Sequence, residues 1–363
     1  MSGIHHFVPV LHRGDAVGRH TLRLRDATRA RGVDSEIFVD TIDHDTADEA
    51  IAVLSYPEMA RPGDVVVYQF ATASTMAPWL ASRSETLVVN YHNVTPPELM
   101  APWDNHLALG QLRAQGDLRL LAPRAALAVA DSAYNEAHLA DSGFAVTAVV
   151  SPSAALDAET TASGNDGRRA TRATGRGARW LAVGRVSPNK ALESTIAALA
   201  VTHTQGNADA TLYIIGKPAT DSYVNALHRY VAELGLADAV LFAGHASDAT
   251  VASAYASADV LVVTSEHEGF CVPVVEAMSA GLPVVAFDQG AVPEVLGGSG
   301  VLVSDKDPYA LAAAITALLT DTSRLDTVVE AERRRLAELN LGSAADRFVD
   351  LLLPLARSEA SST

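Results

Sequence analysis

Cysteine is almost absent from this chain of 363 residues, which contains only Cys271. An internal disulfide is therefore excluded, and a lone cysteine fits a reducing compartment. The sequence has no apolar run of about 18 residues, the length that crosses a membrane. The first residues, MSGIHHFVPVLHRGD, also lack the basic and then apolar layout of a secretory signal. We therefore expect a soluble, cytoplasmic protein.

Positive charge is also scarce, because 27 Lys and Arg residues face 43 Asp and Glu residues, a formal net charge of −16. Binding of nucleic acid needs a basic surface, so we expect no nucleic-acid partner. The exception is residues 1–31, where six arginines outnumber Asp15 and Asp26. A basic helix face from Arg19 to Arg31 could meet an anionic acceptor or a membrane surface. A solvated face of an ordinary helix is the simpler interpretation.

Aromatic residues make up only 6% of the chain, but the hydrophobic fraction of 48% is ordinary for a globular protein. Short β-branched runs alternate with helical patterns through both halves, which is typical of parallel α/β sheets. The predicted strands span residues 4–11, 36–39, 64–69, 86–91, 126–130, 180–183, 211–215, 240–242, 260–263, 284–287 and 301–303. The predicted helices include 192–199, 223–235, 309–319 and 344–355, the last with Phe348, Leu351, Leu352 and Leu355 on one face.

The composition between residues 151 and 179 shifts to Ser, Ala, Thr, Gly, Asp and Arg, with little apolar periodicity. Such a stretch is typical of a linker, and the chain length favours two domains. We predict one doubly wound domain at 1–165, a second at 166–340 and a C-terminal helix within 341–363. The two parallel sheets are expected to face a cleft.

Two loops of the first half follow predicted strands. The first, residues 12–18, contains Gly14 and Gly18 and is expected to face a phosphate, although it is not a GxGxxG fingerprint. The second begins with His92-Asn-Val-Thr-Pro-Pro97, a turn expected to expose His92 at the carboxyl end of its strand. Residues 96–118 read as helix plus loop and are a candidate acceptor surface.

The most informative stretch is ADVLVVTSEHEGFCVPVVEAMSAGLPVV, residues 258–285. Its apolar run predicts a buried strand, Pro273 suits a first helical turn, and Gly281 suits a helix end. Glu268 is thus expected in a loop and Glu276 on the following helix, at the sheet edge where open α/β folds bind ligands. A helix N-terminus favours phosphate there, so the two carboxylates are better explained as acceptors for hydroxyl groups.

Arg185 and Lys190 flank the turn that follows strand 180–183. An Arg fork and a Lys point charge suit a pyrophosphate. An unremarkable surface turn is the alternative.

Several weaker patterns favour a structural reading. Asp43-His-Asp45 and Asp305-Lys-Asp307 imitate a metal-binding D-x-D motif, but both are interpreted as solvated turns, so no metal site is predicted. His267 is interpreted as an exposed loop histidine.

The second half of the chain resembles family 4 of the retaining glycosyltransferases, the glycosyl transferases group 1, which have the GT-B architecture of two Rossmann-like domains. The segments that carry the resemblance are VGRVSPNK (183–190), LYIIG (212–216), LFAG (241–244), residues 255–296 and GVLV (300–303). They occur in the order and spacing of that family.

The resemblance implies a role for each matching position. Glu268 would accept hydroxyls of the donor sugar and Glu276 those of the ribose, while Arg185 and Lys190 would neutralise the diphosphate. The backbone N–H groups near sugar and phosphate would be those of Gly269, Phe270 and Cys271, and Gly216 and Gly244 would border the base. In the first half, Gly14 and Gly18 would approach the diphosphate and His92 the transferred sugar. The C-terminal helix within 341–363 would pack back on the N-terminal domain. Two departures are Cys271, in place of a glycine, and Lys217-Pro218, in place of a glycine-rich turn.

The expected function is that of a retaining glycosyltransferase, a hexosyltransferase by resemblance, that uses a nucleotide-diphosphate sugar as donor. It is expected to need no metal or other cofactor, and the acceptor is unidentified. A sugar-nucleotide epimerase or hydrolase of the same fold is one alternative. A non-catalytic subunit that binds nucleotide sugars is another.

Overall fold

The computed structural model describes residues 2–153 and 177–357. The chain divides into two compact units. The first unit contains Met1–Pro97, His106–Ala154 and Asn340–Thr363, and the second contains Glu98–Asn105 and Ala155–Leu339. The predicted boundary at residue 165 lies outside the described residues. The short segment Glu98–Asn105 belongs to the second unit although both of its neighbours in the chain belong to the first.

The first unit is built on a seven-stranded parallel sheet with the order β3-β2-β1-β4-β5-β6-β7. Its strands are β1 (Ile4–Val10), β2 (Ile37–Thr41), β3 (Ile51–Ala52), β4 (Val65–Phe70), β5 (Thr86–Tyr91), β6 (Ala125–Ala130) and β7 (Thr147–Val149). The five predicted strands are confirmed to within two residues at each end. Strands β3 and β7 were missed because two or three residues are too few to show a periodic pattern.

The helices of the first unit are α1 (Ala16–Ala30), α2 (Tyr56–Met59), α3 (Met76–Ala81), α5 (Asn105–Leu121), α6 (Ala133–Asp141) and α16 (Ala344–Arg357). Helix α4 (Pro97–Met100) begins at the last residue before the chain passes to the second unit. Phe348 and Leu352 of α16 are buried against the first sheet's core, as the predicted apolar face requires. Leu351 was placed on that face but is 37% exposed, because the buried stripe follows the i, i+4 spacing Ala344, Phe348 and Leu352.

The basic face of α1 is covered by acidic partners. Arg25 is buried and pairs with Asp26 and Glu49, Arg29 lies 2.8 Å from Glu36, and Arg31 pairs with Asp346 and Asp350 of α16. Much of the positive charge that the sequence places here is therefore neutralised within the first unit. This weakens the interpretation that α1 meets an anionic acceptor or a membrane. No helix of the described ranges is both long and apolar enough to cross a membrane.

The second unit is built on a six-stranded parallel sheet with the order β10-β9-β8-β11-β12-β13. Its strands, β8 (Arg179–Val183), β9 (Thr211–Ile215), β10 (Val240–Gly244), β11 (Val260–Val263), β12 (Val284–Phe287) and β13 (Val301–Val303), confirm all six predicted strands of this half to within two residues. The helices are α9 (Leu192–Thr204), α10 (Asp221–Glu233), α11 (Asp248–Ser257), α12 (Val272–Ser279), α13 (Val292–Leu296), α14 (Pro308–Thr320) and α15 (Thr322–Leu339).

The strand order of the second unit creates a switch point. The chain leaves β8 toward β9 on one side, whereas β11 pairs with β8 on the other side and continues toward β12. Loops that leave the carboxyl ends of such neighbouring strands run in opposite directions and open a crevice for ligands. The turn with Lys190 follows β8, and the loop with Glu268 follows β11.

A buried carboxyl group joins α15 to the second sheet. Glu332 is 1% exposed, its Oε1 accepts a 2.9 Å hydrogen bond from the backbone N–H of Val284, and its Oε2 has no partner among the described residues. Burial raises the pKa of Glu332 to about 8. The folded second unit therefore favours the neutral acid near neutral pH.

This pKa predicts a loss of stability with rising pH. Glu332 contributes fully to the free energy of unfolding below its unfolded pKa of about 4.5. This contribution is lost as the pH rises through about 8. Between pH 5 and pH 8, the free energy of unfolding of the wild type should fall by roughly 1 kcal/mol per pH unit. Glu332→Gln keeps an acceptor for Val284 but has no charge, so we expect this fall to be absent in the variant. Thermal unfolding of both proteins across this range tests it, and parallel curves would contradict it.

Candidate active site

The turn after β8 presents Arg185 and Lys190 at the switch point. A short 3-10 helix, Pro188–Lys190, follows Ser187, whose Oγ donates a 2.6 Å hydrogen bond to Asn189 Oδ1. Ala191 then adopts φ 45° and ψ 46°, in the left-handed region that non-glycine residues seldom enter, and α9 begins at Leu192. The Lys190 side chain lies close to Gly184, the residue after β8, where an added Cβ would be 3.7 Å from Lys190 Cε.

The loop after β11 has the predicted layout. Glu268 lies in the loop, Pro273 is in the first turn of α12, and Glu276 is the fifth residue of that helix. Cys271, immediately before α12, has φ 71° and ψ 69°. A left-handed residue is most easily a glycine, the residue that the resemblance implies at this position, and a cysteine in this conformation costs of order 1 kcal/mol.

The two loops are joined by hydrogen bonds. The backbone N–H of Glu266 donates to Asn189 O at 2.8 Å, and Asn189 Nδ2 donates to His267 O at 3.2 Å. Thr264 Oγ1 donates to Lys190 O at 3.0 Å. His267 is only 5% exposed, so the expectation of an exposed loop histidine was wrong. The loop that carries it is pinned against the Lys190 turn rather than projecting into solvent.

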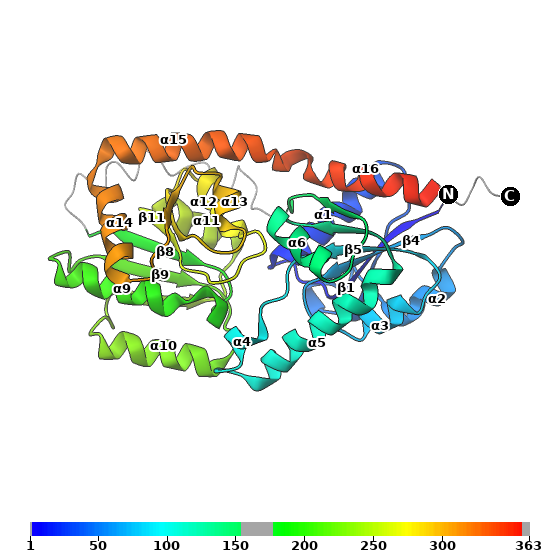
Figure 1. The fold of residues 1–363 in the computed structure, drawn as a ribbon, viewed down its shortest axis with the longest axis horizontal. Coiled ribbons are helices and arrows are strands. Elements are labelled where there is room, and N and C mark those ends of the chain that lie inside the picture. Colours follow the sequence, from blue (N-terminus) through cyan, green and yellow to red (C-terminus); the bar gives the residue numbers. More distant parts are fainter. Residues whose placement is uncertain (1, 154–176, 358–363) are drawn as a thin grey trace. The chain divides into compact units, whose positions relative to one another are not determined.

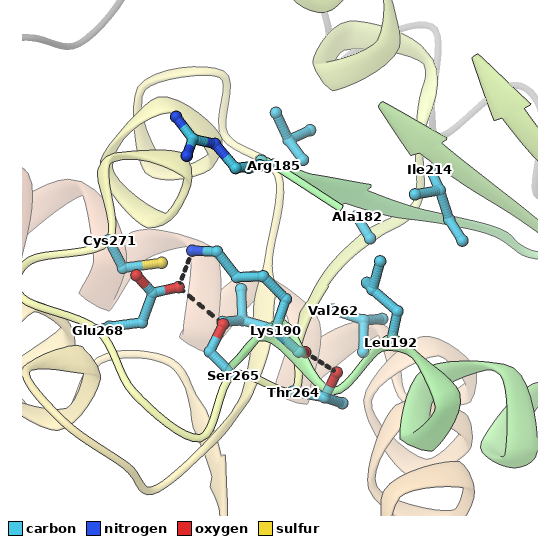
Figure 2. Close-up of a pocket in the computed structure, with 13 residues that line it drawn as sticks. Ala182, Arg185, Lys190, Leu192, Ile214, Val262, Thr264, Ser265, Glu268 and Cys271 are labelled. Atoms are coloured by element: carbon cyan, nitrogen blue, oxygen red, sulfur yellow. Dashed lines mark hydrogen bonds and ion pairs between the residues drawn. The ribbon is translucent and has the colours of Figure 1, made fainter. Parts of the chain in front are cut away.

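Lys190 and Glu268 form an ion pair at the centre of the site, shown in Figure 2. Their side chains are 20% and 9% exposed, and Ser265 Oγ donates to Glu268 Oε1 at 2.7 Å. Burial acts to lower the pKa of Lys190, but the charge and hydrogen bond of Glu268 outweigh it, so the pKa is raised and Lys190 is charged at neutral pH. Burial, and then the Glu268 charge, raises the pKa of the Cys271 thiol.

Arg185 supplies a second cation to the same cavity. Lys190, Glu268, Cys271 and Arg185 all line it, together with Gly184 and Leu192. The Arg185 side chain is exposed and makes no ion pair or side-chain hydrogen bond within the described part of the chain. In Figure 2 its guanidinium lies above the Lys190–Glu268 pair, and no dashed line joins it to either residue. One cation of the site is thus already neutralised, and the other is available to an anion.

The remaining predicted residues of the second unit are not among those that line this cavity. Glu276 is 4% exposed and accepts a 2.8 Å hydrogen bond from Tyr255 of α11, a partner that the sequence pattern did not indicate. Gly216 follows β9 and Gly244 ends β10, and Gly216 N donates to Gly244 O at 2.9 Å. Gly269 lies beside Glu268, and Phe270 is buried.

Backbone packing around the site requires glycine at two positions, Gly216 and Gly290. A Cβ on Gly216 would lie 1.8 Å from Gly184 O, and a Cβ on Gly290 would lie 2.7 Å from Glu268 O. Gly290 was missed by the sequence analysis, although its position after the strand 284–287 was a usable signal. It lets the β12 loop pack against the backbone of Glu268, and Ala291 N donates to Glu268 O at 3.0 Å.

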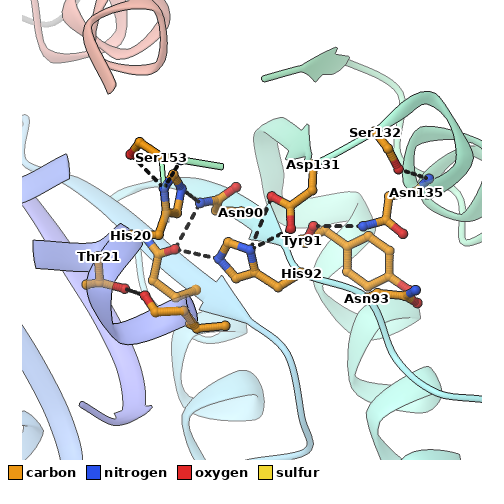
Figure 3. A network of polar contacts seen from close by, with 12 residues as sticks. His20, Thr21, Asn90, Tyr91, His92, Asn93, Asp131, Ser132, Asn135 and Ser153 are labelled. Atoms are coloured by element: carbon orange, nitrogen blue, oxygen red, sulfur yellow. Dashed lines mark hydrogen bonds and ion pairs between the residues drawn. The ribbon is translucent and has the colours of Figure 1, made fainter. Parts of the chain in front are cut away.

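His92 lies in the first unit, in a buried network of polar side chains shown in Figure 3. Its Nδ1 lies 2.9 Å from Asp131 Oδ2, and its Nε2 lies 2.8 Å from Gln69 Oε1. The His92 side chain is only 4% exposed, so the expectation that the turn exposes it was wrong. Both ring nitrogens have partners, one from β4 and one from the residue that follows β6, and local turn chemistry cannot reveal either of them.

The network continues from Gln69 through Asn90 to His20. His20 Nε2 lies 3.0 Å from Asn90 Nδ2, and the backbone N–H of Ser153 donates to His20 Nδ1 at 3.1 Å. Burial holds the pKa of His20 well below its ordinary value, so the ring is neutral. His6 is also buried, 3.1 Å from Gln69 Nε2, and burial lowers its pKa to about 3. These side chains were missed because they come from four separate segments.

The loop with Gly14 and Gly18 is shorter than expected. Helix α1 already begins at Ala16, and Asp15 caps it by accepting a 2.7 Å hydrogen bond from Gly18 N. A Cβ on Gly18 would lie 1.8 Å from His12 O. The absence of a side chain is therefore required by close packing within the loop. Gly14 is exposed.

The two D-x-D sequences close turns, as expected. Asp43 accepts a 2.8 Å hydrogen bond from Asp45 N and lies 3.0 Å from His12 Nδ1. Asp305 accepts a 2.9 Å hydrogen bond from Asp307 N.

The contact at Gly18 predicts the effect of an added methyl group. Gly18→Ala should lower the free energy of unfolding by roughly 2 to 4 kcal/mol, because the His12 backbone must move. Gly110→Ala is the matched helical control, since its Cβ would meet open space, and it should be neutral or stabilising by up to about 1 kcal/mol. Urea unfolding compares them. Equal stability of the two variants would mean that Gly18 is not needed for packing.

The ion pair predicts that Glu268 competes with anions for Lys190. Glu268→Gln keeps the side chain's shape but frees the lysine charge, so inorganic pyrophosphate should bind roughly tenfold more tightly. Isothermal titration calorimetry measures this. Glu266→Gln, which removes an exposed partner of Lys306, is the control and should leave the affinity unchanged. Weaker binding to Glu268→Gln would show that Lys190 is not the anion's partner.

A family model and two curated relatives each match part of the chain. Residues 177–321 match the family model described as Glycosyl transferases group 1. A stretch of 114 residues, 31% of the chain, is 40% identical to an MMP alpha-(1->4)-mannosyltransferase of Mycolicibacterium hassiacum. A longer stretch of 210 residues, 56% of the chain, is 31% identical to a D-inositol 3-phosphate glycosyltransferase of Geodermatophilus obscurus. The matches span 28% and 46% of these two relatives.

Solved structures share the fold over 97% of the chain. The structure of Anabaena HepE in complex with UDP and glucose has a TM-score of 0.75 at 19% identity, covering 97% of this chain and 99% of that one. Sucrose-phosphate synthase from Thermosynechococcus elongatus has a TM-score of 0.78 at 20% identity, with the same coverage. Residues 177–321 are thus similar to the glycosyl transferases group 1 family, in a chain whose two parallel α/β units have the fold of GT-B glycosyltransferases.

Proposed function

We propose that this protein is a retaining glycosyltransferase of family 4 that moves a hexose from a nucleoside diphosphate to an acceptor hydroxyl. The observation that carries the proposal is the grouping of Arg185, Lys190 and Glu268 around one cavity at the switch point of the second sheet. Two cations suit a diphosphate, and a buried carboxylate suits sugar hydroxyls. The group lies within the segment that matches the glycosyltransferase family.

Binding of the nucleotide sugar would break the ion pair between Lys190 and Glu268 and give each residue a partner on the ligand. Its diphosphate would lie against Lys190 and Arg185, and hydroxyls of its sugar would replace Lys190 as the partner of Glu268. Glu276, held by Tyr255, would accept the ribose hydroxyls. UDP-sugars are the first candidates, because HepE structures contain UDP and UDP-glucose.

The proposed chemistry places the acceptor oxygen on the same face of the sugar as the departing phosphate. The bond from the acceptor oxygen to the anomeric carbon forms as the bond to the phosphate oxygen breaks, and the acceptor proton passes to the leaving phosphate. Negative charge grows on the diphosphate, so Arg185 and Lys190 stabilise the transition state more than the ground state. No protein nucleophile, metal ion or other cofactor is assigned to this reaction.

Two other functions stay as alternatives. An epimerase or hydrolase of the same fold would use this cavity with water in place of the acceptor. A binding subunit would hold the nucleotide sugar without breaking it. The available charge of Arg185 and the buried Lys190–Glu268 pair favour catalysis over binding alone.

Turnover assays separate these functions. UDP-, GDP- and ADP-sugars are first screened by thermal shift, since a ligand that binds the folded state raises its melting temperature. We expect nucleotide release from the stabilising donor to require an added acceptor, to persist in EDTA, and to give a product with the donor's anomeric configuration by NMR. Release without acceptor would indicate hydrolysis, and stabilisation without release would indicate a binding subunit.

Lys190→Ala tests the proposed charge role. It should lower kcat by roughly 100-fold or more while raising the donor KM much less, because the lysine charge matters most as the bond breaks. Lys306→Ala, which removes an exposed lysine, is the control. Equal losses in kcat and donor affinity would reduce Lys190 to a binding residue.

A further inference from the structure

A segment from the first half of the chain packs against the second unit. Residues 98–105 belong to that unit, and the ring of Trp103 meets Tyr223 of α10 edge to face, with 4.9 Å between centroids and 73° between planes. Ser222 Oγ donates a 2.5 Å hydrogen bond to Trp103 O. Trp103 also packs against the core of the second unit. The segment is thus anchored on α10 by both a side chain and a backbone group.

Tyr223 reaches from α10 to the start of α9. Its side chain is buried, and its hydroxyl accepts a 3.0 Å hydrogen bond from the backbone N–H of Leu192, the first residue of α9. The hydroxyl in turn donates to Glu193 Oε2 at 2.5 Å. The N-cap residue of α9 is Ala191, which has no side chain that could accept this hydrogen bond. Tyr223 therefore caps α9 from a neighbouring helix.

The capped residue is next to the turn that carries Lys190. Ala191 is held with φ 45°, a conformation of order 1 kcal/mol above the ordinary helical one. Thr264 Oγ1 lies 3.0 Å from both Lys190 O and Ala191 O and fixes one side of the turn. Tyr223 fixes the other side through Leu192. Loss of either anchor would let Ala191 relax and shift the lysine.

We propose that Tyr223 and Trp103 are positioning residues for Lys190. Trp103 holds the Tyr223 ring, the Tyr223 hydroxyl holds the first turn of α9, and that turn orients the lysine. Neither aromatic residue lines the cavity. An effect of these residues on catalysis rests on the proposed function, but their effect on the orientation of Lys190 does not. A segment covalently continuous with the first unit would in this way control the position of a cation in the second.

Hydrogen–deuterium exchange tests the mechanical part without any ligand. Tyr223→Phe keeps the ring and removes the hydroxyl, so amides of residues 187–193 should exchange roughly fivefold faster, a factor typical of one lost hydrogen bond. Trp103→Ala should speed the same amides, and Trp103→Phe should restore most of the protection. Tyr230→Phe, on the same helix, is the control. Unchanged exchange at residues 187–193 in Tyr223→Phe would overturn the proposal.

A double-mutant cycle tests the link to Lys190. Tyr223→Phe should weaken binding of inorganic pyrophosphate roughly threefold in the otherwise wild-type protein and should have no further effect in Lys190→Ala. Equal effects in the two backgrounds would contradict positioning through the lysine. If the cycle is non-additive but no donor sugar is turned over, the proposed function fails and the positioning role stands.

Discussion

The hydrogen-bonded joint between the β8 turn and the β11 loop is the constraint on which the candidate site depends. Asn189 and Thr264 bind these two loops together, so Lys190 and Glu268 meet although they are 78 positions apart. Parallel pairing of β8 with β11 brings the loops to the same sheet edge. Without this joint, a lysine and a glutamate would each stay in solvent, where an ion pair contributes little.

Several residues around this joint serve the fold as much as any ligand. The left-handed conformations of Ala191 and Cys271 direct the chain sharply into α9 and α12, and Gly290 lets a third loop lie on the Glu268 backbone. The strain at Ala191 and Cys271 is offset by the buried packing and hydrogen bonds that surround them. The backbone of the site is therefore held at several points by packing and hydrogen bonds.

The first unit shows the limit of reading side chains from a local pattern. The pattern 86–97 correctly located the end of β5, yet the His92 ring is enclosed by Gln69 of β4 and Asp131 at the end of β6. Exposure depends on what neighbouring strands contribute, and that requires the strand order. The contacts of Tyr255, Tyr223 and Trp103 could not be predicted for the same reason. Their hydroxyl groups or rings contact residues of other elements and not neighbours in the sequence.

The amino-acid sequence by itself determined the alternation of strands and helices, because β-branched runs, Pro273 and Gly281 act through local sterics. It also determined the chemistry at the sheet edge, since charged residues follow the apolar runs of β8 and β11. Only the tertiary structure decided which charges are paired. Lys190 is held by Glu268 while Arg185 is exposed, because burial and partner geometry arise when distant segments pack together.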